Sequence, residues 1–241
     1  VHLQNTLKLI PITIFMLATL SGCQTEKEDY KYLGPVAPYL HEVIYDDYEF
    51  DSDLLTVSPY IPSCSVVRNG NYIGRNFDFY FNDVPEFIVH VKAKEDRYAS
   101  IGVAQVPLFT EQDLLSGNYN KDYFRLIPNV MMDGINEKGV FAGVNVVPYG
   151  DNKPTTGTNP ESEPICALML VRMILDNCSN VNEAKALIDS TNVYCSGEHE
   201  YHLIIGDAKE QYFVEFIDNK ALYLKVKPGN QVMTNFYLNG C

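Results

Sequence analysis

Residues 64–79 read CSVVRNGNYIGRNFDF, and this stretch says most about how the chain folds. The run that begins at Ser65 predicts a strand, Asn69-Gly70 predicts a hairpin turn, and the return strand begins at Tyr72. The hairpin folds Arg75 and Asp78 back toward Cys64. Because an arginine stabilises a neighbouring thiolate and a carboxylate can orient the groups around it, the pattern predicts a cysteine nucleophile, and hence an enzyme.

The chain has 241 residues and a net charge of −13, which suits one domain preceded by leader sequence. So acidic a protein is not expected to bind nucleic acid by bulk electrostatics, and a small-molecule substrate is the better expectation. No phosphate-cradling glycine loop is found, and nothing in the sequence calls for a cofactor. The polar cluster at residues 198–202, EHEYH, lacks the H-E-x-x-H spacing of a zinc site and is interpreted as solvated charge.

The first residues predict export. Lys8 precedes an apolar run from Leu9 to Leu20, which has the length of a secretory h-region and is too short to span a bilayer. Leu20-Ser21-Gly22-Cys23 resembles the bacterial lipobox, so residues 1–23 are predicted to be a lipoprotein signal peptide with the lipid on Cys23. The protein would then be held to the extracytoplasmic face of a membrane in the cell envelope. An ordinary signal peptide is the alternative.

Residues 24–63 are interpreted as a solvated tether followed by a turn-rich propeptide or subunit-like segment. Beyond it the pattern predicts strands, then two helices, then strands again, which indicates an α+β fold with largely antiparallel sheets. The strands are expected at 65–67, 72–73, 87–92, 98–106, 140–147, 201–206, 211–217, 221–226 and 231–234, and the helices at 164–177 and 182–188.

Five motifs occur in an order and at separations that resemble one family, that of the choloylglycine hydrolases, which holds bile salt hydrolases, penicillin V acylases and relatives of acid ceramidase. The resemblance covers the chain from Cys64 to its C-terminus. The motifs are Cys64-Ser65, Gly74-Arg75-Asn76-Phe77-Asp78, Asp133 to Gly139 (DGINEKG), Gly143-Val144-Asn145 and Val232-Met233-Thr234-Asn235.

The resemblance implies an N-terminal nucleophile hydrolase with the αββα sandwich, which cleaves a linear carbon–nitrogen amide bond of an N-acyl substrate. Conjugated bile salts, penicillin V-like amides and fatty-acyl amides are the substrate classes it implies. The nucleophile of such an enzyme is the first residue of the mature chain, and its α-amino group, which titrates near 8, acts as general base. The resemblance therefore implies that the Ser63–Cys64 bond is cleaved, and that this processing is autocatalytic.

The same resemblance implies the roles of the remaining site residues. Arg75 would favour the thiolate of Cys64, Asp78 would orient the new α-amino group, and Asn145 and Asn235 would donate to the oxyanion. Without the family register, Arg75 and Asp78 are also explained by a surface ion pair, and each asparagine by a turn or strand end.

Two features depart from the family pattern. About forty residues separate Cys23 from Cys64, so processing would cut the link between lipid and catalytic domain, and the N-terminal piece would either stay bound or release the enzyme. The family also continues well past the position of Cys241, so residues 64–241 are expected to be a C-terminally truncated catalytic domain.

Export makes every cysteine a candidate for a disulfide. With Cys23 acylated an odd number remains, and Cys64 is predicted to be the unbridged one. Cys166 and Cys178 lie too far apart along one predicted helix to bridge each other and are expected to be core thiols, whereas Cys195 and Cys241 stay undecided. Two alternatives to an enzyme remain open, a degenerate lipoprotein domain that binds a ligand and a disulfide-stapled structural domain. The sequence also leaves open whether the protein forms a homo-oligomer.

Overall fold

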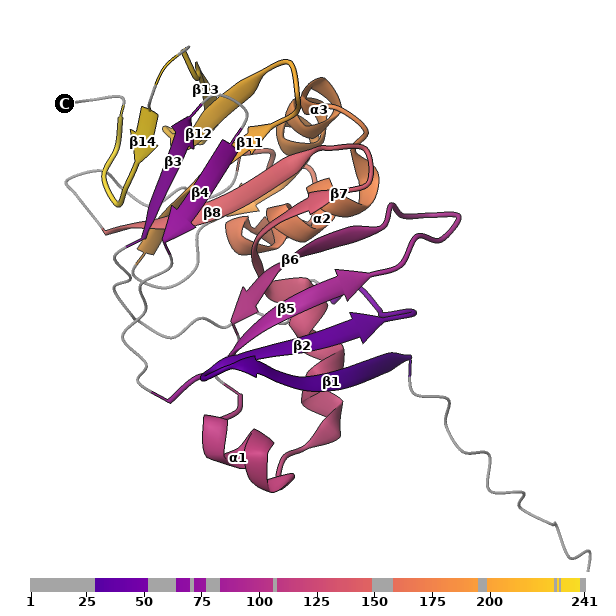
Figure 1. Ribbon diagram of the computed structural model, residues 1–241. Helices are drawn as coiled ribbons and strands as arrows, with labels where there is room; N and C mark the ends of the chain where they lie inside the picture. Colours follow the sequence, from indigo (N-terminus) through magenta and orange to yellow (C-terminus); the bar gives the residue numbers. More distant parts are fainter. Residues whose placement is uncertain are drawn as a thin grey trace, which may run out of the picture.

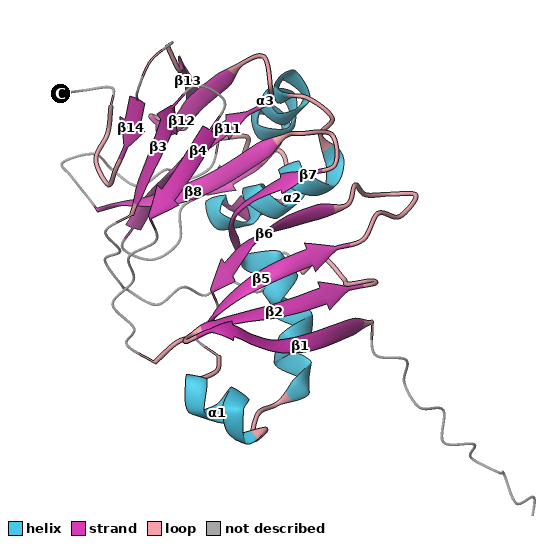
Figure 2. Cartoon of the chain, viewed as in Figure 1, coloured by secondary structure: helices cyan, strands magenta, loops and turns pink. Residues whose placement is uncertain are grey.

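The protein has an α+β fold, as the sequence predicts (Figure 2). The computed structural model describes residues 29–51, 64–69, 72–76, 83–105, 108–148, 158–194, 199–227, 229 and 231–238. Within these residues the strands form one large sheet, one small sheet and a short parallel pair.

The large sheet has nine strands in the order β1-β2-β5-β6-β7-β8-β11-β12-β13. Its neighbours are antiparallel except for β2 and β5, which run parallel. The prediction of largely antiparallel sheets is therefore confirmed. The strands are β1 (Tyr30–Ala37), β2 (Leu40–Tyr45), β5 (Glu86–Val91), β6 (Ser100–Gln105), β7 (Met131–Asn136), β8 (Phe141–Pro148), β11 (His199–Gly206), β12 (Gln211–Ile217) and β13 (Lys220–Lys225).

Helices cover one face of the large sheet and share its main hydrophobic core (Figure 1). They are α2 (Leu170–Asn177), α3 (Val181–Ser190) and the 3-10 helix η1 (Lys121–Val130), while the short α1 (Glu111–Ser116) lies near β1. The predicted helix at 182–188 is confirmed within α3, whose first amides are capped by the side chain of Asn180. No helix in the described ranges is long and apolar enough to cross a membrane.

The prediction of a helix from Pro164 is wrong for its first six residues. The chain there forms β9 (Pro164–Cys166), which pairs in parallel with β10 (Asn192–Tyr194), and then a 3-10 turn, η2 (Ala167–Met169). Backbone pairing with a distant strand overrides the local apolar spacing. Cys166 and Cys178 both carry buried thiols, as expected, and burial raises the pKa of the Cys178 thiol to about 12.

The small sheet lies on the opposite face of the large sheet and has the order β14-β3-β4. It consists of β14 (Gln231–Met233), β3 (Ser65–Asn69) and β4 (Tyr72–Asn76). A second apolar cluster joins the two sheets, and its buried members are Val66, Ile204, Phe213, Val226 and Met233. The described residues thus form three layers, namely helices, large sheet and small sheet (Figure 1).

The loop between β7 and β8 is fixed by one buried side chain. Asn136 accepts hydrogen bonds from the amides of Lys138 and Val140 through its Oδ1. Its Nδ2 donates to the carbonyls of Leu175 and Cys178 at the end of α2. Because all these bonds are buried or half-buried, the strands β7 and β8 are held in one position against α2.

The described part of the segment before Cys64 belongs to the fold, and the interpretation of residues 24–34 as a solvated tether is wrong for residues 30–34, which lie in β1. β1 and β2 extend the large sheet, and Val43 and Tyr45 on β2 are fully buried in the main core. The alternating pattern of β2 is hard to read because a histidine takes a buried position. His41 is accommodated there because Tyr32 and Glu111 satisfy its two ring nitrogens.

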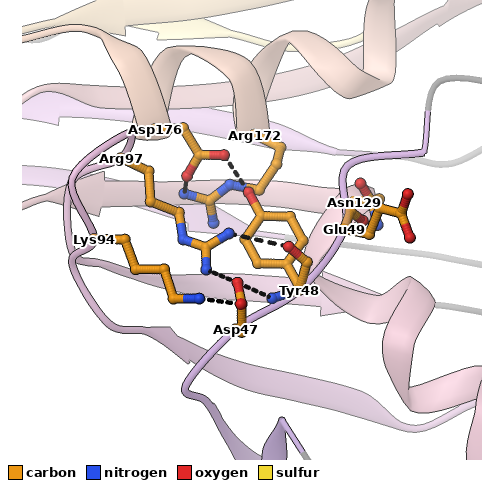
Figure 3. Close-up of polar contacts among 8 residues, drawn as sticks. All are labelled: Asp47, Tyr48, Glu49, Lys94, Arg97, Asn129, Arg172 and Asp176. Carbon is orange, nitrogen blue, oxygen red and sulfur yellow. Dashed lines mark hydrogen bonds and ion pairs between the residues drawn. The ribbon is translucent and has the colours of Figure 1, made fainter.

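A polar network anchors the residues that follow β2 (Figure 3). Asp47 pairs with Lys94 and Arg97, and the Lys94 hydrogen bond is the main cause that lowers the pKa of this carboxyl to about 2. The hydroxyl of Tyr48 donates to Asp176, which also pairs with the buried Arg172. The network is completed by Asn129, whose amide contacts the backbone of Glu49 and Asp51. Residues 29–51 are therefore held along their whole length, by the large sheet as far as Tyr45 and by side chains of α2, η1 and the segment between β5 and β6 beyond it.

Candidate active site

Cys64 lies immediately before β3 and carries a thiol that is only 2% exposed. Since side chains alternate along a strand, Cys64 shares a face with Val66, which is buried between the two sheets. On β4 the register places Arg75 opposite Val66, so its side chain enters the same layer. The hairpin prediction is confirmed, although Asn69, expected in the turn, is the last residue of β3 and pairs with Tyr72.

The guanidinium of Arg75 links the sulfur to the large sheet. Its Nη2 lies 4.0 Å from Sγ of Cys64 and donates to the carbonyl of Val144 at 2.5 Å. Its Nη1 donates to Oδ2 of Asp133 at 2.9 Å, and its Nε donates to Oδ1 of Asn145 at 3.4 Å. A fixed cation is thereby held against the thiol, in surroundings that favour the thiolate.

Two carboxylates accompany Arg75 that the sequence analysis did not assign to the site. Asp133, on β7, forms an ion pair with Arg75 in which the two side chains are 19% and 6% exposed, respectively. Glu86, at the start of β5, lies within the electrostatic reach of both groups: burial raises the pKa of its carboxyl, Arg75 lowers it and Asp133 raises it. The sequence identified Asp133 only as part of a motif, because its ion-pair partner, Arg75, lies on the other sheet.

The two asparagines come from different sheets. Asn145 is on β8, fully buried, and its Nδ2 lies 3.5 Å from the carbonyl of Met233. Asn235 follows β14, and its Nδ2 donates to the carbonyl of Val146 at 2.5 Å. The antiparallel pairing of β3 with β14 ends at Val66 and Met233, and continuing that register by two residues puts Cys64 level with Asn235. Each amide nitrogen keeps a second hydrogen for another acceptor.

The interpretation of residues 198–202 as solvated charge is wrong for Glu200 and His202. Both are on β11 and face the small sheet, with exposures of 2% and 0%. Burial raises the pKa of the Glu200 carboxyl to about 7. The polar residues of this segment predicted side chains exposed to solvent, but a central strand of a covered sheet has no solvent-facing side.

Other predicted residues cannot be placed. Asp78 and the lipidation candidate Cys23 lie outside the described residues, as do Cys195 and Cys241. Of the proposed site, the structure therefore brings together Cys64, Arg75 and Asn145 by contact, and Asn235 by strand register.

Comparison with solved structures finds a bile acid hydrolase and a penicillin V acylase among its matches. A variant of the conjugated bile acid hydrolase from Clostridium perfringens matches with a TM-score of 0.45 and 18% identity, over 70% of this chain and 52% of that one. Penicillin V acylase from Agrobacterium tumefaciens matches with a TM-score of 0.35 and 21% identity, over 72% of this chain and 44% of that one. The chain thus spans about half the length of these structures.

No curated protein matches the chain. The family model described as acyl-coenzyme A:6-aminopenicillanic acid acyl-transferase matches residues 67–240, which include four of the five motifs in whole and all but the start of the β3–β4 hairpin. This agrees with the resemblance drawn from the sequence, and it assigns the α+β layers to the N-terminal nucleophile hydrolase fold. The chain belongs to the acyl-coenzyme A:6-aminopenicillanic acid acyl-transferase family, within the choloylglycine hydrolase group.

Proposed function

We propose that this protein is a cysteine N-terminal nucleophile amidase, which hydrolyses a linear carbon–nitrogen amide bond of an N-acyl substrate. The observation that carries the proposal is the position of Arg75, whose guanidinium contacts Sγ of Cys64 while it binds Asp133 and Asn145. A buried structural cysteine has no need of a cation held against its sulfur. Membership of the family supports the same chemistry.

The mechanism begins with cleavage of the Ser63–Cys64 bond, because an internal cysteine has no α-amino group. The freed amine takes the thiol proton as the sulfur attacks the amide carbonyl. Asn145 and Asn235 donate to the resulting oxyanion, and preorganised donors of this kind are each worth about 3 kcal/mol of barrier. The amine then returns its proton to the leaving nitrogen, the carbon–nitrogen bond breaks, and a thioester remains. Water hydrolyses the thioester to the acid and regenerates the thiol.

We also propose that residues 29–51 remain bound after this cleavage, as a non-covalent subunit. The support is the pairing of β2 with β5 and the anchoring of Asp47 and Tyr48 described above. If Cys23 is lipidated after export, as the lipobox resemblance suggests, the retained segment would keep the catalytic domain at the membrane.

The substrate class is an N-acyl amide such as a conjugated bile salt, a penicillin V-like amide or a fatty-acyl amide. The family description favours a second candidate activity, acyl transfer, because a thioester can pass its acyl group to an amine as well as to water. Product analysis with and without an added amine acceptor distinguishes the two activities.

The proposal is tested by incubating the full chain with glycocholate, penicillin V and an N-acyl amino acid, and detecting the released amine. Turnover by the wild type that is lost in Cys64→Ala, with the same thermal unfolding, supports the amidase. A folded wild type that turns over none of these substrates would favour the alternative of a non-catalytic, ligand-binding lipoprotein domain.

A further inference from the structure

A row of buried polar side chains crosses the large sheet next to Cys64 and Arg75. The strand register places Asn145 on β8 directly opposite His202 on β11, and His202 directly opposite Glu215 on β12. The three residues are 1%, 0% and 0% exposed. Because cross-strand partners lie on the same face of a sheet, all three are directed toward the small sheet.

Each member of this row contacts the chain between Met233 and Leu238. Nδ2 of Asn145 lies 3.5 Å from the carbonyl of Met233, and Nε2 of His202 lies 2.7 Å from the carbonyl of Thr234. The amide of Leu238 donates to Oε1 of Glu215 at 2.5 Å. A carbonyl only accepts, so the hydrogen of this His202 contact is assigned to Nε2.

The other ring nitrogen of His202 faces Glu215. Nδ1 lies 4.0 Å from the same Oε1 that accepts from Leu238, in a region where both side chains are fully buried. Replacing such a pair by apolar side chains of similar volume is often neutral or stabilising. A buried polar pair is therefore not required for packing, whereas its directional contacts fix the segment that it binds.

Asn235 lies inside that segment, between the contacts at Thr234 and Leu238. Strand β14 ends at Met233, and residues 234–238 carry no further strand pairing in the described structure. Side-chain contacts from the large sheet therefore take over where the ladder stops. They hold the chain on both sides of Asn235, which is level with Cys64 in the register.

We propose that His202 and Glu215 are positioning residues of the active site, which hold residues 234–238 so that the Asn235 amide is directed at the oxyanion. They act through Asn235 and do not touch the substrate. The inference rests on the proposed amidase function for its catalytic part, but not for the structural restraint on residues 234–238.

The test compares His202→Gln, which keeps an N–H donor for the carbonyl of Thr234, with His202→Leu, which removes it. Ile204→Val is the matched control, since Ile204 lies two residues along the same face of β11 and in the second apolar cluster. Each full-length variant is analysed by hydrogen exchange of a peptide covering residues 231–238 and by kcat and KM on whichever of the three amide probes the wild type cleaves.

His202→Leu should speed exchange in residues 231–238 and lower kcat by about 10- to 100-fold, since a misplacement of about 1 Å costs up to about 100-fold. Its KM should stay within about threefold, because the lost contribution belongs to the transition state. His202→Gln and Ile204→Val should stay near the wild type in every readout. If His202→Leu does not fold, His202→Asn replaces it, since its side chain is too short to reach Thr234.

Three results would overturn the proposal: unchanged exchange in the folded His202→Leu protein, a rise in KM at constant kcat, or a His202→Gln protein as impaired as His202→Leu. If the wild type cleaves none of the probes, the amidase function fails and the exchange measurement alone decides. Faster exchange would then uphold the restraint on residues 234–238, and unchanged exchange would reject it.

Discussion

Tyr45→Ala tests whether the segment before Cys64 stays bound after cleavage. The ring of Tyr45 is 1% exposed in the main core, and its hydroxyl donates to the carbonyl of Phe124. Truncating a buried aromatic side chain costs about 3–5 kcal/mol, to which the unpaired carbonyl adds about 1 kcal/mol. The lower end of this sum, about 4 kcal/mol, already corresponds to a dissociation constant roughly 1000-fold higher.

The assay is native mass spectrometry of the processed protein over a dilution series. The wild type should keep its N-terminal fragment on dilution, and Tyr45→Ala should lose it at a much higher protein concentration than the wild type does. Leu33→Ala, at a 43% exposed position of β1, is the control and should behave as the wild type. The same Tyr45 substitution should lower the free energy of unfolding of the uncleaved Cys64→Ala protein by a similar amount. A fragment that leaves the wild type at micromolar concentration, or equal retention in Tyr45→Ala, would refute the reasoning.

Three further predictions follow from the same contacts. Burial raises the pKa of the Glu200 carboxyl from 4.5 to about 7, so stability that is present below pH 4.5 should be lost as the pH rises to 7, by up to about 3 kcal/mol. Glu200→Gln should remove this loss. The free energy of unfolding, measured by chemical unfolding, would contradict the prediction if its pH profiles ran parallel in the wild type and the variant. In Gly102→Ala the new Cβ would lie 2.0 Å from the carbonyl oxygen of Asp133, so the free energy of unfolding should fall by about 1–3 kcal/mol. An unshifted midpoint of thermal unfolding would argue against so close an approach of the two strands. Arg75→Met leaves Asp133 without its ion-pair partner, which should cost about 3 kcal/mol of stability and abolish turnover, whereas a stable, active variant would exclude the assigned role of Arg75.

The elements with strong local signals were predictable. The strand at residues 211–217 is reproduced as β12, and the hairpin after Cys64 brings Arg75 to the sulfur as expected. In both cases the period-2 alternation or the turn chemistry lies within a few residues, so no distant contact is needed to read it.

The missed elements depend on distant partners. β2 escapes a pattern search because His41 takes a buried position, which only Tyr32 and Glu111 make favourable. The same applies to the site. Asp133 acquires its meaning from Arg75 across the gap between two sheets, and His202 is buried because the small sheet covers β11. Sequence spacing contains no information on which faces will meet, so Asp133 was interpreted only as part of a motif and His202 only as solvated charge.

The central claim is that Cys64 becomes the first residue of a mature chain and uses its own α-amino group as the base. The most direct measurement is the intact mass and N-terminal sequence of the purified protein, for the wild type and for Cys64→Ala. We predict a wild-type species that begins at Cys64 and that is absent from the Cys64→Ala preparation. A wild type that cleaves amides while its Ser63–Cys64 bond is intact would contradict the account.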